Sequence, residues 1–407
     1  MLTLNAYIHK VDGVNGCLLV NTATSEVLDL GIEDAASLDK IMSQQVENSR
    51  LKEYLLKNGW GTETEETSKP EELCQFDLES RGLTEFSLNK VIIEVSGECG
   101  LDCCFCNADN YNAFASCTCK RWNYKEADID YTNIVEQLIS FRVQKVMIIG
   151  GDPFYNAFER LKSLLNILNE KGYTGEIVIM TNGQSLNKAK IEFISKFKNV
   201  RVNIIFMGSN EDEYRVITRK KKVFKTVIKN VKLLRKYDVC VNGTYLVNCF
   251  NISDIENSEI NALGINIGVK HIFDEKYNTK ALIFSHSSRM LKIDYQADKL
   301  LRETNCCLYS QVFIASNLEV YPCPYLRDFQ LGNLQNEKLF EIFRTGKYRE
   351  FWFLSKNKIE SCSSCKYHTV CVDCRAIEYG ITHDLYAEYF CDEVSKISSI
   401  KKICEGK

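Results

Sequence analysis

Four cysteines lie within eight residues in the stretch Cys99-Gly-Leu-Asp-Cys-Cys-Phe-Cys106, which follows the apolar run Val91-Ile-Ile-Glu-Val95. Thiols at this density form disulfides, bind zinc or hold an iron–sulfur cluster. The spacing Cys-x3-Cys-x2-Cys supplies three thiolates from one loop, which suits three irons of a cubane and leaves the fourth iron without a protein ligand. Structural zinc usually takes four ligands from paired Cys-x2-Cys arms, and this stretch has one such arm. The spacing therefore favours an iron–sulfur cluster, although Cys104 leaves an alternative ligand assignment open.

The composition excludes several classes of protein and of cysteine site. The chain has 407 residues, which predicts two or three domains, and its net charge of −3 gives no electrostatic case for nucleic-acid binding. The N-terminus does not read as a signal peptide, and no apolar run approaches the ~20 residues of a membrane helix. We therefore expect a cytoplasmic protein without a membrane partner, in which thiols stay reduced. Nineteen cysteines in such a chain indicate metal binding or catalysis rather than a disulfide scaffold.

Between about residues 88 and 275, apolar strand-like runs alternate with amphipathic helix-like runs. The predicted strands are Val91–Val95, Lys145–Ile149, Glu176–Met180, Val200–Phe206, Cys240–Val247 and Ile267–Phe273. The predicted helices are Ile134–Phe141, Phe158–Lys171, Asn187–Phe197, Val223–Tyr237 and Ile252–Leu263. This alternation predicts an α/β fold with parallel strands and right-handed crossovers, in the form of an open, partial (βα)6 TIM-like barrel. Ligands of such folds bind at the carboxyl ends of the strands.

The regions on either side of this core differ from it. Residues 1–60 predict a small α+β domain with strands at Leu2–Val11, Cys17–Asn21 and Glu26–Leu30, turn signals at Asp12-Gly13 and Asn15-Gly16, and helices at Ala36–Gln45 and Arg50–Lys57. Residues 61–87 are polar and suit a linker, and residues 88–290 form the predicted core. Residues 291–407 are rich in cysteine, with short helices expected at Asp294–Thr304 and Leu339–Phe351.

Polar or glycine-rich residues follow three of the predicted strands, where a ligand would bind. The second strand ends in Ile148-Ile-Gly-Gly-Asp-Pro-Phe154, in which adjacent glycines allow close approach to the backbone and the proline stiffens the exit. The third strand ends in Met180-Thr-Asn-Gly183, and Gly208-Ser-Asn210 follows the fourth. Taken alone, each of these is an ordinary strand-to-helix turn.

The cysteine stretch, with Phe105 before its last cysteine and a strand before its first, resembles the signature of the radical S-adenosylmethionine (AdoMet) superfamily. The resemblance implies a [4Fe-4S] cluster on Cys99, Cys103 and Cys106. It implies that reductive cleavage of AdoMet yields a 5′-deoxyadenosyl radical, which removes hydrogen from a substrate carbon. Asp152 stands where the family usually has glutamate. The cofactor-binding residues implied by the resemblance are Phe105, Gly150, Gly151, Asp152, Pro153, Thr181, Asn182, Ser209 and Asn210.

The C-terminal cysteines show a second pattern. Cys362-x2-Cys365-x5-Cys371-x2-Cys374, with Cys391 later and Cys307 and Cys323 upstream, resembles a SPASM domain, which implies two auxiliary [4Fe-4S] clusters and three in all. By this resemblance the outer cluster is bound by Cys362, Cys365, Cys371 and Cys391. The inner cluster is bound by Cys307 (or Cys306), Cys323 and Cys374. The alternative, a zinc ribbon from Cys362 to Cys374, does not account for the upstream pair.

The strand and helix order of residues 1–60 is similar to that of the PqqD-like, winged-helix-like elements that recognise leader peptides. The resemblance then implies a maturase of a ribosomally synthesised precursor peptide, which installs a thioether or C–C cross-link. A flavodoxin or ferredoxin-type protein would donate the electron. One alternative is a maturase of a protein substrate, of the anaerobic sulfatase-maturase type. Another is a non-catalytic metal-binding scaffold, against which the intact cysteine triplet and the Gly-Gly-Asp-Pro turn count. No catalytic side chain is identified from the sequence.

Overall fold

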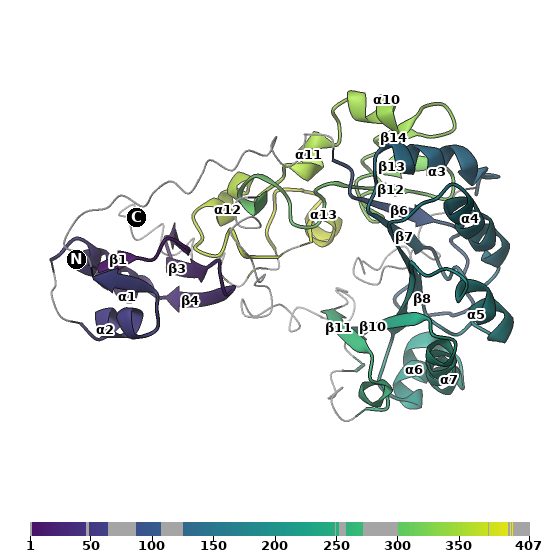
Figure 1. Ribbon diagram of the computed structural model, residues 1–407, viewed down its shortest axis with the longest axis horizontal. Helices are drawn as coiled ribbons and strands as arrows, with labels where there is room; N and C mark the ends of the chain where they lie inside the picture. The colour runs from purple at the N-terminus through teal and green to yellow at the C-terminus, as the bar shows by residue number, and fades with distance from the viewer. Residues whose placement is uncertain are drawn as a thin grey trace. The chain divides into compact units, whose positions relative to one another are not determined.

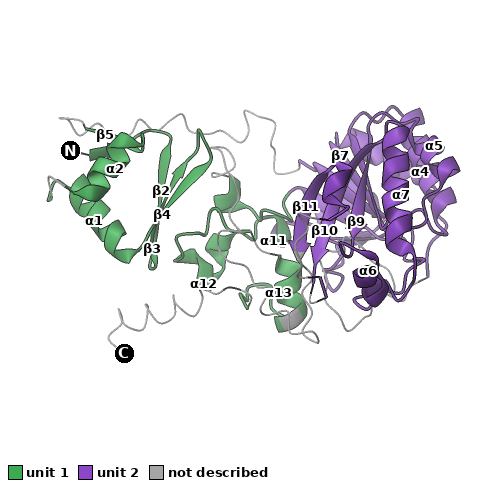
Figure 2. Cartoon of the chain, turned by 90° about the horizontal axis from the view of Figure 1, so that it is seen from below, with its two compact units in different colours: residues 1–85, 283–309, 350–407 green, residues 86–282, 310–349 purple. Residues whose placement is uncertain are grey.

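The computed structural model describes residues 2–45, 49–63, 87–106, 125–248, 250–251, 258–271, 300–372, 374–389, 391 and 393. The chain divides into two compact units, which are coloured separately in Figure 2. Unit 1 joins residues 1–85 to residues 283–309 and 350–407, and unit 2 comprises residues 86–282 and 310–349. Each unit therefore combines segments that are distant in the sequence. The predicted division into an N-terminal domain, a linker, a core and a C-terminal domain stays a prediction.

Unit 2 is built on a nine-stranded sheet with the order β11-β10-β9-β8-β7-β6-β12-β13-β14. All neighbours from β11 to β12 pair in parallel. The six strands of the predicted core are β6 (Lys90–Glu94), β7 (Lys145–Ile149), β8 (Glu176–Thr181), β9 (Val200–Phe206), β10 (Cys240–Val247) and β11 (Asn266–His271). Strands β6, β7 and β8 are mostly buried, continuous apolar runs, as expected for central parallel strands, whereas β11 at the edge of the sheet is mostly exposed. Residues 272–273 of the predicted sixth strand lie outside the described residues. Among the described strands β6 and β11 do not pair, so the sheet is open, as predicted.

Helices alternate with these strands and lie along the outer side of the curved sheet (Figure 1). They are α3 (Tyr131–Ser140), α4 (Phe158–Glu170), α5 (Lys188–Ile194), α6 (Glu211–Thr218) and α7 (Val223–Lys236). Helix α6 was not predicted, although Asn210 caps its start and three acidic residues fill its first turn. Of the predicted helix Ile252–Leu263, residues 252–257 lie outside the described residues. The described remainder contains a single 3-10 turn, Asn261–Leu263.

A hairpin from the C-terminal part of the sequence extends this sheet. Strand β12 (Gln311–Ile314) pairs in parallel with β6, and β13 (Glu319–Tyr321) and β14 (Gly332–Asn333) follow in antiparallel pairing. The predicted C-terminal domain therefore contributes three strands to unit 2.

A buried ion pair joins this hairpin region to the end of β6. Arg327 Nη2 lies 3.0 Å from Glu94 Oε1, and the two side chains are 5% and 0% exposed. The amide and hydroxyl of Ser316 both donate to the other carboxylate oxygen of Glu94, at 3.1 and 3.2 Å. The guanidinium of Arg327 lies 4.8 Å from the centre of the Phe313 ring. Such additional contacts are what a buried pair needs to offset the loss of hydration.

The N-terminal part of unit 1 contains a three-stranded sheet followed by two helices, near the predicted positions, and a separate strand pair. Strands β2 (Ile8–Gly13), β3 (Gly16–Asn21) and β4 (Glu26–Leu30) form an antiparallel sheet in that order. Helices α1 (Ile32–Met42) and α2 (Arg50–Lys57) follow. The sheet and helices enclose a core that includes Cys17, Leu19, Leu38 and Leu55.

The predicted strand Leu2–Val11 is two strands. Strand β1 (Leu2–Leu4) leaves the sheet and pairs with β5 (Gly61–Glu63), while β2 starts at Ile8. The chain turns between them because the Ile8 amide donates to the Asn5 carbonyl at 2.8 Å. The Asn5 side chain also donates to the Gly59 carbonyl at 2.7 Å, which ties this turn to the end of α2.

The C-terminal elements are short. They are α10 (Leu339–Arg344), α11 (Arg349–Trp352), η5 (Lys356–Lys358), α12 (Glu360–Ser363) and α13 (Arg375–Thr382). The single helix predicted over Leu339–Phe351 is interrupted where Gly346 takes a φ of +74°, a conformation that ends helices and favours glycine. Of the predicted helix Asp294–Thr304, residues 294–299 lie outside the described residues, and residues 300–303 are helical.

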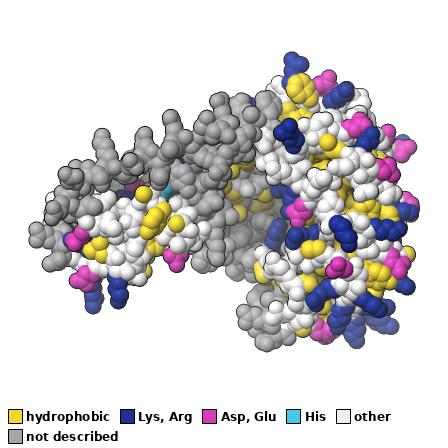
Figure 3. All heavy atoms as spheres, in the orientation of Figure 1, with side chains coloured by type: hydrophobic (Ala, Val, Ile, Leu, Met, Phe, Trp, Pro, Cys, Tyr) yellow, Lys and Arg dark blue, Asp and Glu magenta, His cyan; other side chains and the backbone are white. Residues whose placement is uncertain are grey.

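The described surface carries both signs of charge. Lys and Arg side chains lie among Asp and Glu side chains on the visible face of unit 2 (Figure 3), in keeping with the net charge of −3. Among the helices that the structure describes, each is too short or too polar to cross a lipid bilayer.

Replacing Arg327 with Met should lower the free energy of unfolding by about 3–5 kcal/mol, because Glu94 would stay buried without its cation. The measurement is urea unfolding of the reconstituted protein. Lys162→Met is the matched control, because it removes a cation from the exposed Lys162–Glu159 pair and should change stability little. Equal losses in the two variants would contradict a stabilising role for the buried pair.

Candidate functional site

The cysteine loop after β6 lies against the end of β7. The Gly151 amide donates to the Ser96 carbonyl at 2.9 Å, and the Asp152 amide donates to the Glu98 carbonyl at 2.8 Å. A Cβ atom on Gly150 would overlap the Ser96 carbonyl, and one on Gly151 would overlap the Glu98 carbonyl. Because Gly150 and Gly151 have no side chains, the backbone of the cysteine loop can lie directly against them. That it also contacts AdoMet stays a prediction.

The loop is fixed at further points along its length. The Cys106 amide donates to the Cys103 carbonyl at 3.0 Å, and the Cys104 amide donates to the Ile217 carbonyl in α6 at 2.9 Å. Cys103 and Cys106 are buried, whereas Cys99 is partly exposed. Phe105 is also buried, with its ring centre 5.9 Å from that of Phe250.

The Cys99 sulfur accepts two hydrogen bonds. The Leu101 amide donates to Cys99 Sγ at 3.4 Å, and Asn182 Nδ2 donates to it at 3.3 Å. Asn182 follows β8 and is 4% exposed, so a strand end that is distant in the sequence reaches the first cysteine. Donors of this kind hold the sulfur in one orientation, as second-shell partners of metal ligands do. The predicted residue Asn182 thus contacts a predicted cluster ligand directly.

Among the described residues, no three Cys, His, Asp or Glu side chains are arranged to hold one metal ion. In a cubane each thiolate binds a different iron, so its ligands do not converge on a single point as zinc ligands do. The loop supplies three cysteines, with amide donors beside one of them. These cysteines fit an iron–sulfur cluster, because they need not converge on one metal ion.

Asp152 is fully buried at the end of β7. Its Oδ1 accepts from Thr181 Oγ1 at 2.6 Å and from the Phe154 amide at 3.2 Å. Its Oδ2 has no hydrogen-bond partner among the described residues. Burial raises the pKa of Asp152 above its ordinary value, and the interactions with Thr181, Phe154 and Ser185 and the charge of Lys190 offset only part of that effect. A buried carboxylate oxygen without a partner suits a cationic donor, and the ammonium group of AdoMet is one.

The remaining predicted AdoMet residues have partners within the chain. Thr181 binds Asp152, as described above. Asn210 Oδ1 accepts from the Asp212 and Glu213 amides and so caps helix α6, and Ser209 Oγ donates to Glu213 at 3.1 Å. Pro153 is buried directly after Asp152. Contacts of these residues with AdoMet stay predictions.

One carboxylate that supports the start of the loop was missed from the sequence. Glu126 Oε1 accepts from Ser96 Oγ at 2.6 Å and from the Gly97 amide at 3.0 Å. Its other oxygen lies 2.9 Å from Arg160 Nη1 in α4. Nothing in the local sequence marks Glu126, because its partners lie about thirty residues away on either side.

The C-terminal cysteines fall in both units. Cys323 belongs to unit 2, whereas the other predicted auxiliary ligands belong to unit 1. Within unit 1, Cys391 lies close enough to Cys365 to influence it electrostatically. Burial raises the pKa of the Cys365 thiol, while hydrogen bonds from the Tyr367 amide and the Asn15 side chain oppose that rise. The Cys365 amide also donates to the Cys362 carbonyl at 2.9 Å, and Cys371 packs against the buried core that contains Cys365. That these cysteines bind one cluster stays a prediction.

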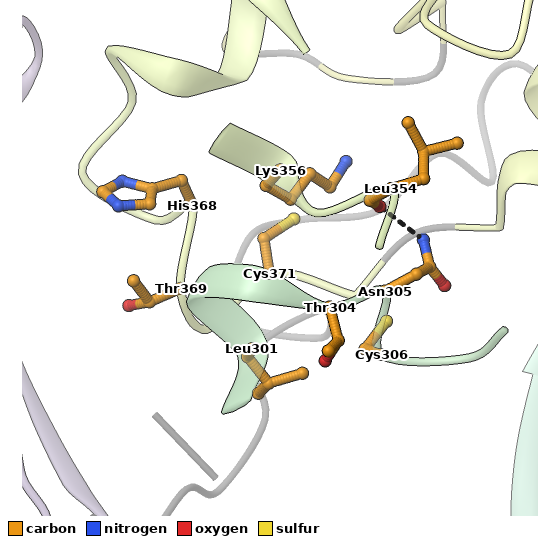
Figure 4. A pocket seen from close by; sticks show the side chains of 9 residues that line it. All are labelled: Leu301, Thr304, Asn305, Cys306, Leu354, Lys356, His368, Thr369 and Cys371. Atoms are coloured by element: carbon orange, nitrogen blue, oxygen red, sulfur yellow. Dashed lines mark hydrogen bonds between the residues drawn. The ribbon is translucent and has the colours of Figure 1, made fainter. Parts of the chain in front are cut away.

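Cys306 and Cys371 line one small cavity in unit 1, together with Lys356 and His368 (Figure 4). Its volume of about 10 Å³ is that of a site for roughly one water molecule. Cys307 is exposed, and its amide donates to Asn305 Oδ1 at 2.9 Å. The assignment of Cys307 or Cys306 to the inner cluster therefore stays a prediction.

A buried charge network surrounds Cys362. Glu388 Oε2 lies 2.8 Å from Lys356 Nζ and 2.6 Å from Arg375 Nη2, and all three side chains are buried. Lys356 Nζ also lies 3.8 Å from Cys362 Sγ, and the thiol lies 3.6 Å from Glu388 Oε2. An ammonium group beside this sulfur would favour a negatively charged cluster at Cys362. The sequence did not indicate these three residues as part of the site.

Comparison with known proteins identifies two domains. Residues 93–259 match the radical SAM superfamily, and residues 306–366 match the iron–sulfur cluster-binding domain SPASM. The chain is similar to the cysteine-type anaerobic sulfatase-maturating enzyme of Clostridium novyi (strain NT), with 23% identity over 376 residues, 78% of this chain and 98% of that enzyme. It is also similar to GTP 3′,8-cyclase of Clostridium perfringens (strain SM101 / Type A), with 27% identity over 186 residues, 46% of this chain and 53% of that enzyme.

Two solved structures share the fold. Native anSMEcpe with bound AdoMet has a TM-score of 0.56 and 18% identity, over 78% of this chain and 99% of that chain. Streptococcus suis SuiB has a TM-score of 0.50 and 18% identity, over 96% of this chain and 99% of that chain. The predicted AdoMet and [4Fe-4S] cofactors are confirmed at the level of the two domains, whereas the number of clusters and their ligands stay predictions. The chain therefore joins a radical SAM domain at residues 93–259 to a SPASM domain at residues 306–366.

Proposed function

We propose that this chain is a maturase of a ribosomally synthesised precursor peptide, in which it installs a thioether or carbon–carbon cross-link. The observation that carries the proposal is the small N-terminal sheet with an open edge, which shares a compact unit with the C-terminal cysteines. An open edge binds an extended peptide by adding it as a further strand. In an enzyme that acts on a peptide, such an element would bind the substrate.

The sheet has two edge strands, β2 and β4, and we propose that the peptide binds at the edge of β4. Among the described strands, β3 is the only neighbour of β4. The two-residue turn after Gly13 makes Gly13 and Gly16 a hydrogen-bonded pair, and the pairing alternates along β3 from there. It follows that Val27 and Asp29 direct their backbone N–H and C=O groups away from β3. These groups are the expected partners of a leader peptide.

The residues of unit 2 supply the reaction site. When bound, AdoMet and the [4Fe-4S] clusters supply a 5′-deoxyadenosyl radical that removes hydrogen from carbon, and an acceptor for the electron released as the cross-link forms. Cys99, Cys103 and Cys106 hold the catalytic cluster, and Asn182 orients the first of these thiolates. Asp152 binds the AdoMet ammonium, and the buried surroundings of Phe105 exclude water from the loop. A flavodoxin or ferredoxin-type protein is the proposed electron donor.

A second candidate is the maturation of a protein substrate. It is favoured by the match that covers almost the whole length of an anaerobic sulfatase-maturating enzyme. About a fifth of the present chain lies outside that match, however, so the relative does not account for every part of it.

One incubation separates the two candidates. Reduced, reconstituted enzyme is mixed with AdoMet and, in parallel, with the peptide encoded by a neighbouring short reading frame or with a sulfatase-derived peptide. Loss of a pair of hydrogen atoms from the first peptide, seen by mass spectrometry, supports the proposal. Modification of the sulfatase peptide alone supports the second candidate. If no 5′-deoxyadenosine forms with either peptide, both are wrong.

Replacing Cys99, Cys103 and Cys106 with Ala should abolish formation of 5′-deoxyadenosine, because the catalytic cluster loses its three thiolates. The variant should retain the iron of the auxiliary sites, which separate cysteines bind. Chromatography of the products and iron analysis provide the two measurements. Loss of all iron would indicate that the loop is not an independent cluster site.

Replacing Asp152 with Asn should weaken AdoMet binding roughly 10- to 100-fold, because a neutral amide replaces the carboxylate opposite the ammonium. Equilibrium binding under anaerobic conditions gives the Kd. Glu159→Gln is the control, since it removes an exposed carboxylate from α4 and should leave the Kd unchanged. An affinity of Asp152→Asn within about twofold of the control's would count against this role of Asp152.

Replacing Val27 with Pro should weaken binding of the leader peptide by about 2- to 10-fold, because the edge loses one N–H donor without loss of a bond to β3. Val27→Thr, which keeps the N–H and the β-branched shape, is the matched control. Fluorescence anisotropy with a labelled leader measures both affinities. The same Kd in both variants would remove β4 as the binding edge.

A further inference from the structure

The β2–β3 turn packs directly on the cysteine loop between Cys362 and Cys371, within unit 1. The Val14 amide donates to the Ser364 carbonyl at 2.8 Å, and the Lys366 amide donates to Asn15 Oδ1 at 3.0 Å. A Cβ atom on Gly13 would overlap the backbone of Lys366. The turn and the loop are therefore in close backbone contact.

Side chains from the N-terminal sheet extend this contact. Val11, Leu18 and Val20 share a buried core with the loop residues Cys365, Tyr367 and Val370. Asp29 of β4 lies 2.6 Å from Lys366 Nζ and accepts from the Tyr367 hydroxyl at 2.5 Å. The path of the cysteine loop thus depends on residues more than three hundred positions earlier in the chain.

Asn15 reaches the cysteine itself. Its Nδ2 lies 3.7 Å from Cys365 Sγ and 2.9 Å from Glu393 Oε2, and an amide nitrogen carries two hydrogens, one for each acceptor. Asn15 is 8% exposed and Cys365 is 6% exposed, so water competes little for either group. Hydrogen bonds to the sulfurs of a cluster stabilise its reduced form and raise its reduction potential.

We propose that Asn15 is a positioning residue of the outer auxiliary cluster, and that through it the N-terminal domain sets the potential of that cluster. The inference rests on the proposed role of Cys365 as a cluster ligand. It assigns the domain a second task besides peptide binding. It also means that deleting residues 1–60 changes the reduction potential of the outer cluster as well as the affinity for peptide.

The test uses full-length protein with Cys99, Cys103 and Cys106 replaced by Ala, so that auxiliary clusters alone contribute. EPR-monitored redox titration of this protein, with and without Asn15→Ala, should show one auxiliary potential shifted to a lower value at unchanged iron content. Asn21→Ala is the matched control, because Asn21 caps the turn at the other end of β3 and makes no hydrogen bond to a cysteine among the residues that the structure describes. Potentials that are the same in Asn15→Ala and in the control overturn the inference.

A second measurement needs no substitution at Asn15. In the same three-cysteine variant, asparagine labelled with ¹⁵N at the side-chain amide should show magnetic coupling to a reduced cluster, and absence of coupling overturns the inference. Iron analysis of Cys365→Ala tests the assumption beneath it. If that variant keeps all of its iron, Cys365 is not a cluster ligand. If it loses one cluster, Cys365 is a ligand, and a negative result with Asn15→Ala then rules out only the role of Asn15.

Discussion

The close backbone contact between the cysteine loop and the end of β7 is the constraint on which the site depends. Two amides of β7 and its exit donate to carbonyls of the loop, and the glycine pair leaves no room for a side chain between them. Because parallel strands present their carboxyl ends at one edge, the loop, Asp152 and Asn182 meet there although they are distant in the sequence. The sheet thus positions the thiolates and the proposed AdoMet contacts together.

The buried carboxylates of the two units have different partners. In unit 2, Asp152 is held by a hydroxyl and an amide and keeps one oxygen without a partner among the described residues, so it is prepared for a cation. In unit 1, Glu388 is already paired with Lys356 and Arg375, and the ammonium group of Lys356 lies beside Cys362. Burial strengthens both effects, since a low local dielectric raises the cost of an unpaired charge. One arrangement suits the binding of a cationic ligand, and the other suits a negatively charged cluster.

The N-terminal domain is part of the cysteine-rich unit rather than an independent attachment. It contributes a docked turn, a shared core and an ion pair to the loop that contains Cys365. In the proposed maturase, the sheet that binds the leader peptide would also support the outer cluster. Peptide recognition and electron acceptance would then depend on one folded unit.

The sequence by itself determined the cysteine loop, the glycine pair and the six parallel strands, because each depends on local spacing or on a continuous apolar run. It did not place β12 beside β6, pair Glu94 with Arg327, or bring Asn15 to Cys365, because these contacts join segments more than two hundred residues apart. It also did not show that Asn210 serves as a helix cap, since a polar residue after a strand suits a cap and a ligand equally well. Tertiary structure decided the long-range contacts because packing between distant segments, not local preference, selects which buried polar groups become partners.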